Sequence, residues 1–280
     1  MEYQMGEEKI SNFCEYLYRE ECSRGTIEKY VRDIKNFYAW LDGRGVNKEN
    51  AAKWKEHLLE KGYAPVTINS MVSAVNRFFR FAGWEECHIK FLHIQRKMFR
   101  EQSKELTRNE YKRLLKAAGR QGNERLELAM ETICSTGIRV SEVRYITVEA
   151  AKRGRTEISL KGKIRTILIP DKLCRKLLKF AEKQKNTSGE IFLTRSGNHL
   201  SRHQIWYEMK KLCKSTGIEP SKVFPHNLRH LFAATFYRVC SDIVKLADIL
   251  GHSSIDTTRI YLISTGAEHA QQMARLGLLS

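Results

Sequence analysis

The chain has 280 residues, with 49 Lys and Arg against 32 Asp and Glu, which gives a formal net charge of +17. No apolar run approaches the roughly 18 residues of a membrane-spanning helix, and the acidic start MEYQMGEEKI lacks the pattern of a signal peptide. We therefore expect a cytoplasmic protein without a membrane partner. The basic residues are spread along the chain, which favours a folded surface that binds a polyanion over a basic tail.

Amphipathic periodicity predicts four helices in the first part of the chain. The first covers approximately residues 8–19, and the second is the stretch TIEKYVRDIKNFYAWL, which Thr26 caps and DGRG ends. The third runs through KENAAKWKEHLLE and stops at Gly62, and the fourth opens at Pro65 and closes at Gly83. Short connections between amphipathic helices predict a small all-α bundle over residues 1–95.

A charged stretch without periodicity follows, and we interpret residues 96–105 as a linker between two domains. Thr107 and Glu110 then form a T-x-x-E capping box that starts a helix. Further helices are expected at about 125–134 and from near Val140. The stretch TEISLKGKIRTILIP alternates apolar and polar residues around a Lys-Gly turn, which predicts a β-hairpin that Pro170 ends.

The last part of the chain again has helical patterns. Asp171 is expected to cap a helix, and EIFLT is expected to form a short strand. Helical segments follow at about 202–215, 227–239 and 243–250, then one that carries Tyr261, and finally an amphipathic tail from about Ala267. These patterns predict a mainly α fold with a small antiparallel β-sheet, which is the α+β class.

Three short strings in this half carry candidate chemistry. They are STGIRVSEV with Arg139, HNLRH with His226, Arg229 and His230, and LGHSSIDTTRIYL with His252 and Tyr261. Arg229 lies at the border of the apolar face of its helix, so its guanidinium needs an anion, either an internal carboxylate or a phosphate of a ligand. Tyr261 taken alone is equally compatible with a packed core ring.

A metal site at the two histidines of HNLRH is disfavoured. His226 and His230 have the i, i+4 spacing of a zinc pair, but Asn227 stands where the general base of H-E-x-x-H would be. Arg229 between them would also repel a cation. The same residues suit phosphoryl transfer at a phosphodiester, because two arginines neutralise the non-bridging oxygens and a hydroxyl attacks phosphorus. That chemistry requires no metal.

The three strings, in this order and spacing, resemble the tyrosine recombinase (phage integrase) family of site-specific DNA recombinases. TGIRVSEV is similar to its first arginine box, HNLRH matches H-x-L-R-H, and LGHSSIDTTRIY matches its L-G-H…Y signature. TIEKYVRDIKNFYAWL resembles its helical core-binding domain. The hairpin departs from the family pattern G-K-G-x-K-x-R, since LKGKIR lacks the leading glycine and one turn residue.

The resemblance implies roles for individual residues. Six are expected to be catalytic, and three others to support them: Arg139, Lys161, His226, Arg229, His252 and the nucleophile Tyr261, with Glu142, His230 and Lys163 in support. Lys161 aligns with the general acid that protonates the 5′ oxygen, while Lys163 is the alternative. Neither a cofactor nor a metal is expected.

The resemblance also implies the organisation and the partners. Residues 1–95 correspond to a SAM-like core-binding domain, 96–105 to the linker, and 106–280 to a catalytic domain whose C-terminal helix docks into a neighbouring subunit. The expected substrate is double-stranded DNA with inverted half-sites, bound by a dimer on each site and by a tetramer in synapsis. A type IB topoisomerase activity and a catalytically silent DNA-binding protein remain as alternatives.

Overall fold

The computed structural model describes residues 2–94, 102–160, 163–259, 261 and 274–275. The chain divides into two compact units, Met1–Arg96 (unit 1) and Lys97–Ser280 (unit 2). Each unit buries an extensive hydrophobic cluster made of its own residues. The units are therefore described one at a time.

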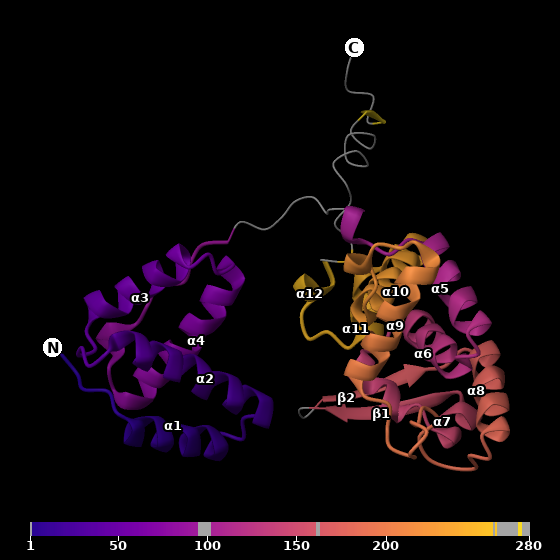
Figure 1. The fold of residues 1–280 in the computed structure, drawn as a ribbon, viewed down its shortest axis with the longest axis horizontal. Coiled ribbons are helices and arrows are strands. Elements are labelled where there is room, and N and C mark those ends of the chain that lie inside the picture. Colours follow the sequence, from indigo (N-terminus) through magenta and orange to yellow (C-terminus); the bar gives the residue numbers. More distant parts are fainter. Residues whose placement is uncertain (1, 95–101, 161–162, 260, 262–273, 276–280) are drawn as a thin grey trace. The chain divides into compact units, whose positions relative to one another are not determined.

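The described residues of unit 1 form a bundle of four α-helices (Figure 1). Their bounds are α1 Glu7–Arg19, α2 Arg24–Leu41, α3 Lys48–Glu60 and α4 Pro65–Ala82, followed by the 3-10 helix η1 Glu85–Cys87. The prediction that Thr26 caps α2 is wrong. Ser23 is the cap, because its hydroxyl accepts a hydrogen bond from the backbone N–H of Thr26, so that the helix starts earlier. α4 begins at Pro65 and ends before Gly83, as predicted.

Aromatic rings dominate the core of unit 1. The ring centroid of Phe37 lies 5.0 Å from that of Trp54 and 5.8 Å from that of Phe79, and both pairs meet edge to face. This geometry is favourable because the positive ring edge meets the negative ring face. The buried carboxylate of Asp33 pairs with Lys29 at 2.7 Å. Unit 1 therefore combines a dense apolar core with one locally paired buried charge.

Unit 2 contains the remaining elements. The helices before the hairpin are η2 Gln102–Lys104, α5 Arg108–Arg120, α6 Glu124–Thr136, η3 Val140–Tyr145 and α7 Val148–Arg153. The antiparallel hairpin consists of β1 Arg155–Leu160 and β2 Lys163–Leu168. After it come α8 Asp171–Lys183, α9 Arg202–Thr216, η4 Pro220–Lys222, α10 Pro225–Cys240, α11 Ile243–Leu250 and α12 Ile255–Arg259.

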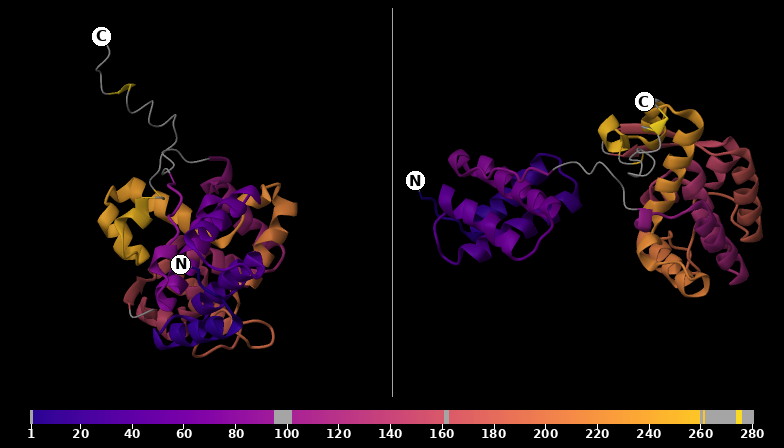
Figure 2. Two further views of the ribbon diagram at one scale, coloured as in Figure 1. Left: turned by 90° about the vertical axis from the view of Figure 1, so that its left-hand side faces the viewer. Right: turned by 90° about the horizontal axis from the view of Figure 1, so that it is seen from above.

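Helix α6 runs through the middle of unit 2. It contacts α5, α8, α9 and α10. These helices surround it in the ribbon view of Figure 1, and Figure 2 shows the same unit from two other sides. Its side chains Ala129, Met130 and Ile133 are completely buried, so they form the face of the helix that packs in the core. The end of α6 is thereby held at the centre of the unit, where the site described below begins.

The hairpin presents one buried and one exposed face. Ile158 and Ile167 are 2% and 3% exposed, and Arg165 lies on the same face because it is directly opposite Ile158 in the register. Ile164 and Leu168 point the other way and are 76% and 70% exposed. The predicted hairpin is thus confirmed, while its turn residues Lys161 and Gly162 lie outside the described residues.

Two local predictions for unit 2 are wrong. EIFLT forms only isolated bridges and no strand, because the adjacent residues Ile191 and Phe192 are both buried and no ladder partner is present among the described residues. Asp171 is the first residue of α8, whose cap is Pro170. The helix predicted from near Val140 is present as the six-residue 3-10 helix η3.

Other predictions for unit 2 hold. Thr107 and Glu110 form the capping box of α5, with both reciprocal hydrogen bonds present. The fold is mainly helical with a small antiparallel sheet, which is the predicted class. The predicted tail helix lies outside the described residues except at Ala274 and Arg275, and so does much of the predicted linker. Within the described part of the chain, every helix is too short or too polar to span a bilayer.

Candidate active site

Arg229 is the most deeply buried cation of the site. It lies in the second turn of α10 and is only 2% exposed. Its Nη1 donates to the carbonyl oxygen of Gly137 at 2.7 Å, and its Nη2 donates to the carbonyl oxygen of Leu250 at 2.8 Å. Among the described residues no carboxylate lies within ion-pair distance of Arg229, so the alternative of an internal salt bridge is not found.

Two helix ends hold this guanidinium. Gly137 directly follows α6 and Leu250 is the last residue of α11, so Arg229 binds carbonyl groups at two negatively polarised helix C-termini. Gly137 has a φ of +68°, and a Cβ there would lie 2.4 Å from the ring of Phe232. Only glycine therefore places this carbonyl against Arg229. Burial, and then the charge of Arg139, lower the pKa of Arg229, but a guanidinium remains charged at neutral pH.

A buried carboxylate links two further arginines. Glu142 is 1% exposed, and its Oε1 accepts from Nη1 of Arg139 at 2.9 Å. Its Oε2 accepts from the backbone N–H of Arg139 at 2.7 Å and from Nη2 of Arg165 at 2.5 Å. The side chain of Arg139 is nevertheless 43% exposed. Glu142 thus orients Arg139 at the surface of the site.

The site has an excess of positive charge. Arg139, Arg165 and Arg229 are connected through shared partners, and Glu142 is the carboxylate that ion-pairs with two of them. An excess of buried and half-buried guanidinium groups is unfavourable unless an anion completes the cluster. The arrangement therefore indicates that the site binds an anion, and planar guanidinium groups match phosphate oxygens best.

His252 is neutral and has a defined tautomer. Its Nε2 lies 2.8 Å from Nη2 of Arg229 and its Nδ1 lies 2.9 Å from Oγ1 of Thr258. Because a guanidinium only donates, Nε2 must accept and the proton must be on Nδ1, which donates to Thr258. Burial first, and then the charges of Arg229, Arg139 and Arg165, lower the pKa of His252 to about 4. This imidazole is therefore uncharged at physiological pH.

Tyr261 is buried beside these groups. It is 4% exposed and packs with Ala233, Leu246 and Leu250. Its ring is nearly parallel to that of His252, with centroids 5.7 Å apart, and it meets the ring of His230 at 4.4 Å. A hydrogen bond with Tyr261 also raises the pKa of Arg229 against the larger effect of burial. The phenol therefore lies within the arginine cluster of its own subunit.

The position of Tyr261 corrects one expectation. Helix α12 ends at Arg259, so Tyr261 follows the helix instead of lying within it. Its backbone N–H donates to the carbonyl oxygen of Thr258 at 3.0 Å, which holds it one turn beyond the residue that binds His252. Thr258 is completely buried. It connects Tyr261 to His252, because its carbonyl oxygen accepts from Tyr261 and its hydroxyl group bonds Nδ1 of His252.

The two histidines of HNLRH lie beside the tyrosine. His226 is exposed at the start of α10, and its ring centroid is 6.3 Å from that of Tyr261, whereas His230 is half-buried and closer. Asn227 between them is buried and donates to the carbonyl oxygens of Lys104 and Lys222, so it anchors the helix start. The described residues contain no group of three or more His, Cys, Asp or Glu placed to hold a metal ion.

The side chains of two predicted site residues are not described, and one residue of the site was not predicted from the sequence. Lys161 lies outside the described residues, and Lys163 is described only by its backbone, opposite Leu160 in the hairpin. Arg165 was absent from the predicted site. The available signal was the alternation of β2, which places Arg165 on the buried face with Ile167, where a charged residue needs a partner.

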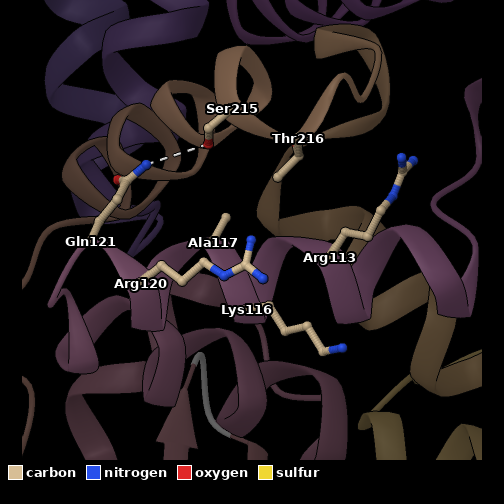
Figure 3. A pocket seen from close by; sticks show the side chains of 7 residues that line it. All are labelled: Arg113, Lys116, Ala117, Arg120, Gln121, Ser215 and Thr216. Carbon is tan, nitrogen blue, oxygen red and sulfur yellow. Dashed lines mark hydrogen bonds between the residues drawn. The ribbon is translucent and has the colours of Figure 1, made fainter.

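A cavity lies between α5 and the end of α9. Its volume is about 360 Å³ and its lining is basic: Arg113, Lys116, Ala117, Arg120, Gln121, Ser215 and Thr216 (Figure 3). The hydroxyl groups of Ser215 and Thr216 donate to the carbonyl oxygen of Leu212, so they are not oriented toward an anion. Arg120 lies in the last turn of α5, where the helix C-terminus attracts a cation without any ligand. None of the site residues lines this cavity.

Comparisons with known proteins agree with this geometry. Residues 104–268 match the phage integrase family, and residues 10–86 match its N-terminal SAM-like domain. Tyrosine recombinase XerA of Thermococcus kodakarensis is 31% identical over 279 residues, which cover 96% of each chain.

Solved structures show the same fold. A dimer of lambda integrase residues 75–356 bound to a COC' core site has a TM-score of 0.74 at 19% identity, over 93% of this chain and 95% of that one. XerH recombinase bound to its difH substrate has a TM-score of 0.67 at 17% identity, over 95% and 84% of the two chains. The chain therefore belongs to the phage integrase family and is a site-specific tyrosine recombinase.

Proposed function

We propose that the chain cuts and rejoins double-stranded DNA at specific sites through a covalent 3′-phosphotyrosyl intermediate on Tyr261. The observation that carries this proposal is the position of the Tyr261 ring beside His252 and within the cluster of Arg139, Arg165 and Arg229. A phenol beside converging guanidinium groups is suited to attack a phosphodiester whose charge those groups neutralise.

The cleavage step exchanges one phosphorus–oxygen bond for another. The phenol oxygen of Tyr261 attacks phosphorus, the bond to the 5′ oxygen breaks, and the chain keeps the 3′ phosphate. The phenol proton passes to a neighbouring base, for which His226 is the candidate, and Lys161 protonates the leaving 5′ oxygen. Because the phosphotyrosyl bond replaces the phosphodiester bond, a 5′ hydroxyl can reverse the step without ATP.

Arg139 and Arg229 bind the non-bridging oxygens in this proposal. Arg139 uses Nη1 for Glu142 and is 43% exposed, so its other N–H groups can contact phosphate. His252 accepts from Arg229, and it donates to phosphate only in the other tautomer, with the proton on Nε2. The hydroxyl of Thr258 permits that exchange because it can either accept from Nδ1 or donate to it.

Recombination requires more than one subunit. We propose that two copies bind inverted half-sites and that two such dimers form a tetramer, in which successive strand exchanges pass through a Holliday junction. Residues 1–95 would bind the core DNA together with the catalytic residues 106–280, joined by the linker 96–105. The segment from Ala267 would dock into a neighbouring subunit. The net charge of +17 supports a DNA partner, and binding should weaken steeply with salt.

The proposal is tested with DNA sites selected from a random pool by binding. A nicked duplex that carries the selected site should give a covalent adduct on a denaturing gel, and Tyr261→Phe should abolish the adduct while leaving DNA binding intact. DNA binding without any adduct would identify a silent DNA-binding protein. An adduct accompanied by relaxation of supercoils, but without strand exchange, would identify a topoisomerase.

A further inference from the structure

Arg165 bridges three separate elements of unit 2. It comes from β2, its side chain is 12% exposed, and its Nη2 donates to Oε2 of Glu142 in η3 at 2.5 Å. Its Nη1 donates to the carbonyl oxygen of Leu250 at the end of α11. A single side chain therefore connects the hairpin, the start of η3 and the helix that precedes His252.

Each acceptor of Arg165 also binds one of the other arginines. Glu142 holds Arg139 through its second carboxylate oxygen at 2.9 Å. The carbonyl oxygen of Leu250 also accepts from Arg229 at 2.8 Å. Arg165 therefore shares one acceptor with Arg139 and another with Arg229, the two arginines that are proposed to bind the phosphate. Its side chain connects the carboxylate of Glu142 to the carbonyl group of Leu250.

The surrounding backbone is shaped for this side chain. Gly251 has a φ of +64°, and a Cβ at this position would lie 2.3 Å from Cδ of Arg165. Glycine at 251 therefore serves two purposes, since it permits the left-handed turn before His252 and leaves space for Arg165. An ordinary surface ion pair has no such requirement, because exposed partners adapt to each other.

We propose that Arg165 is a positioning residue that holds Glu142 and the carbonyl group of Leu250 and thereby sets the relative position of Arg139 and Arg229 on the scissile phosphate. The inference rests on the proposed function of those two arginines. It assigns to Arg165 no contact with the DNA. Its consequence is that loss of Arg165 weakens the stabilisation of phosphate charge and has little effect on the binding of DNA.

Two substitutions separate position from charge. Arg165→Met retains the apolar stem but loses both hydrogen bonds, and Arg165→Lys retains the charge but cannot reproduce the planar, two-pronged contact. Single-turnover cleavage by both variants should be about 100-fold slower than wild type, as expected for misplacement of a catalytic group. If Arg165→Lys were as fast as wild type, a purely electrostatic role would replace the proposal.

A neutral substrate gives the decisive comparison. A methylphosphonate at the scissile position lacks one charged non-bridging oxygen, so the alignment of Arg139 and Arg229 matters less there. The defect of Arg165→Met should fall from about 100-fold on phosphate to below about 10-fold on methylphosphonate, measured as the ratio to wild type on each substrate. Equal defects on both substrates would indicate a general loss of structure and would overturn the inference.

Further controls distinguish the remaining outcomes. Arg155→Ala, on the exposed face of the same hairpin, should cleave both substrates like wild type. A substrate with a sulfur leaving atom at the 5′ position needs no protonation, so rescue of Arg165→Met by this substrate would place Arg165 with the leaving group and refute the inference. Absence of a wild-type adduct on every substrate would instead refute the proposed function.

Discussion

The two units bury charge in different ways. Unit 1 packs its aromatic core tightly and buries the carboxylate of Asp33, which pairs with lysine and arginine in its own helix. Unit 2 buries Glu142 and Arg229 and partly buries Arg165. The partners of these three groups come from four separate elements, and the cationic groups exceed the anionic ones. Such a cluster is poor for stability, so its presence in one unit marks the place where a ligand completes it.

This difference predicts separate consequences for substitution. A change in the core of unit 1 should appear mainly in the free energy of unfolding. A change in the arginine cluster of unit 2 should appear mainly in the rate of strand cleavage. Four predictions test this separation.

Phe37→Ala in unit 1 should have the largest effect on stability. Phe37 is completely buried against Trp54 and Phe79, so its removal should lower the free energy of unfolding by about 3–5 kcal/mol. Tryptophan fluorescence during urea unfolding measures this change, in a Trp206→Phe background that removes the tryptophan of unit 2. Tyr18→Ala, at a side chain that is 61% exposed, is the control and should change stability little.

Arg229→Ala in unit 2 should show the reverse pattern. Removing one preorganised donor of this kind typically slows catalysis about 10²–10³-fold, and a single-turnover cleavage assay measures it. The free energy of unfolding should change by no more than about 1–3 kcal/mol, because the carbonyl group of Gly137 loses its partner while cationic repulsion is relieved. Arg238→Ala, exposed in the last turn of the same helix, is the control. A large loss of stability with normal cleavage would contradict the comparison.

Thr258→Val should have a smaller effect on cleavage. Valine has nearly the same shape as threonine but cannot form the hydrogen bond to Nδ1 of His252. Losing the about 1 kcal/mol with which this bond stabilises the orientation of the imidazole should slow cleavage about 5-fold. The neighbouring substitution Thr257→Val, at an exposed position of α12, should leave the rate unchanged. Identical rates for the two variants would show that Thr258 does not orient His252.

The pH dependence of stability tests the environment of His252 independently of cleavage. The pKa of His252 is about 4 in the folded protein and near 6.5 when unfolded, so the unfolded state binds more protons between these values. Its contribution to stability is therefore present above pH 6.5 and is lost as the pH falls toward 4. Urea unfolding at several pH values gives the free energy of unfolding as a function of pH. In this window that free energy should change less steeply with pH for His252→Gln than for wild type. His203→Gln, at an exposed histidine, should keep the wild-type slope.

Local sequence patterns predicted most of the helices and the hairpin. The capping box at Thr107, the proline at the start of α4 and the alternation around the hairpin act through neighbouring residues, so they can be read without a structure. EIFLT was misjudged because a strand needs a partner ladder from elsewhere in the chain. The cap of α2 was misplaced by three residues because both Ser23 and Thr26 are acceptable caps.

The family and the order of the site residues can be read from the amino-acid sequence, since Arg139, Arg229, His252 and Tyr261 stand in short motifs whose spacing is specific. The contacts that hold those residues in place are visible only in the folded chain. The burial of Glu142 and its bond to Arg165, 23 residues away, depend on how the hairpin packs against η3. The hydrogen bonds of Arg229 likewise depend on the ends of α6 and α11, which come together only in the folded unit. Charges that are distant in the chain pair through packing, and packing is not a property of any short segment.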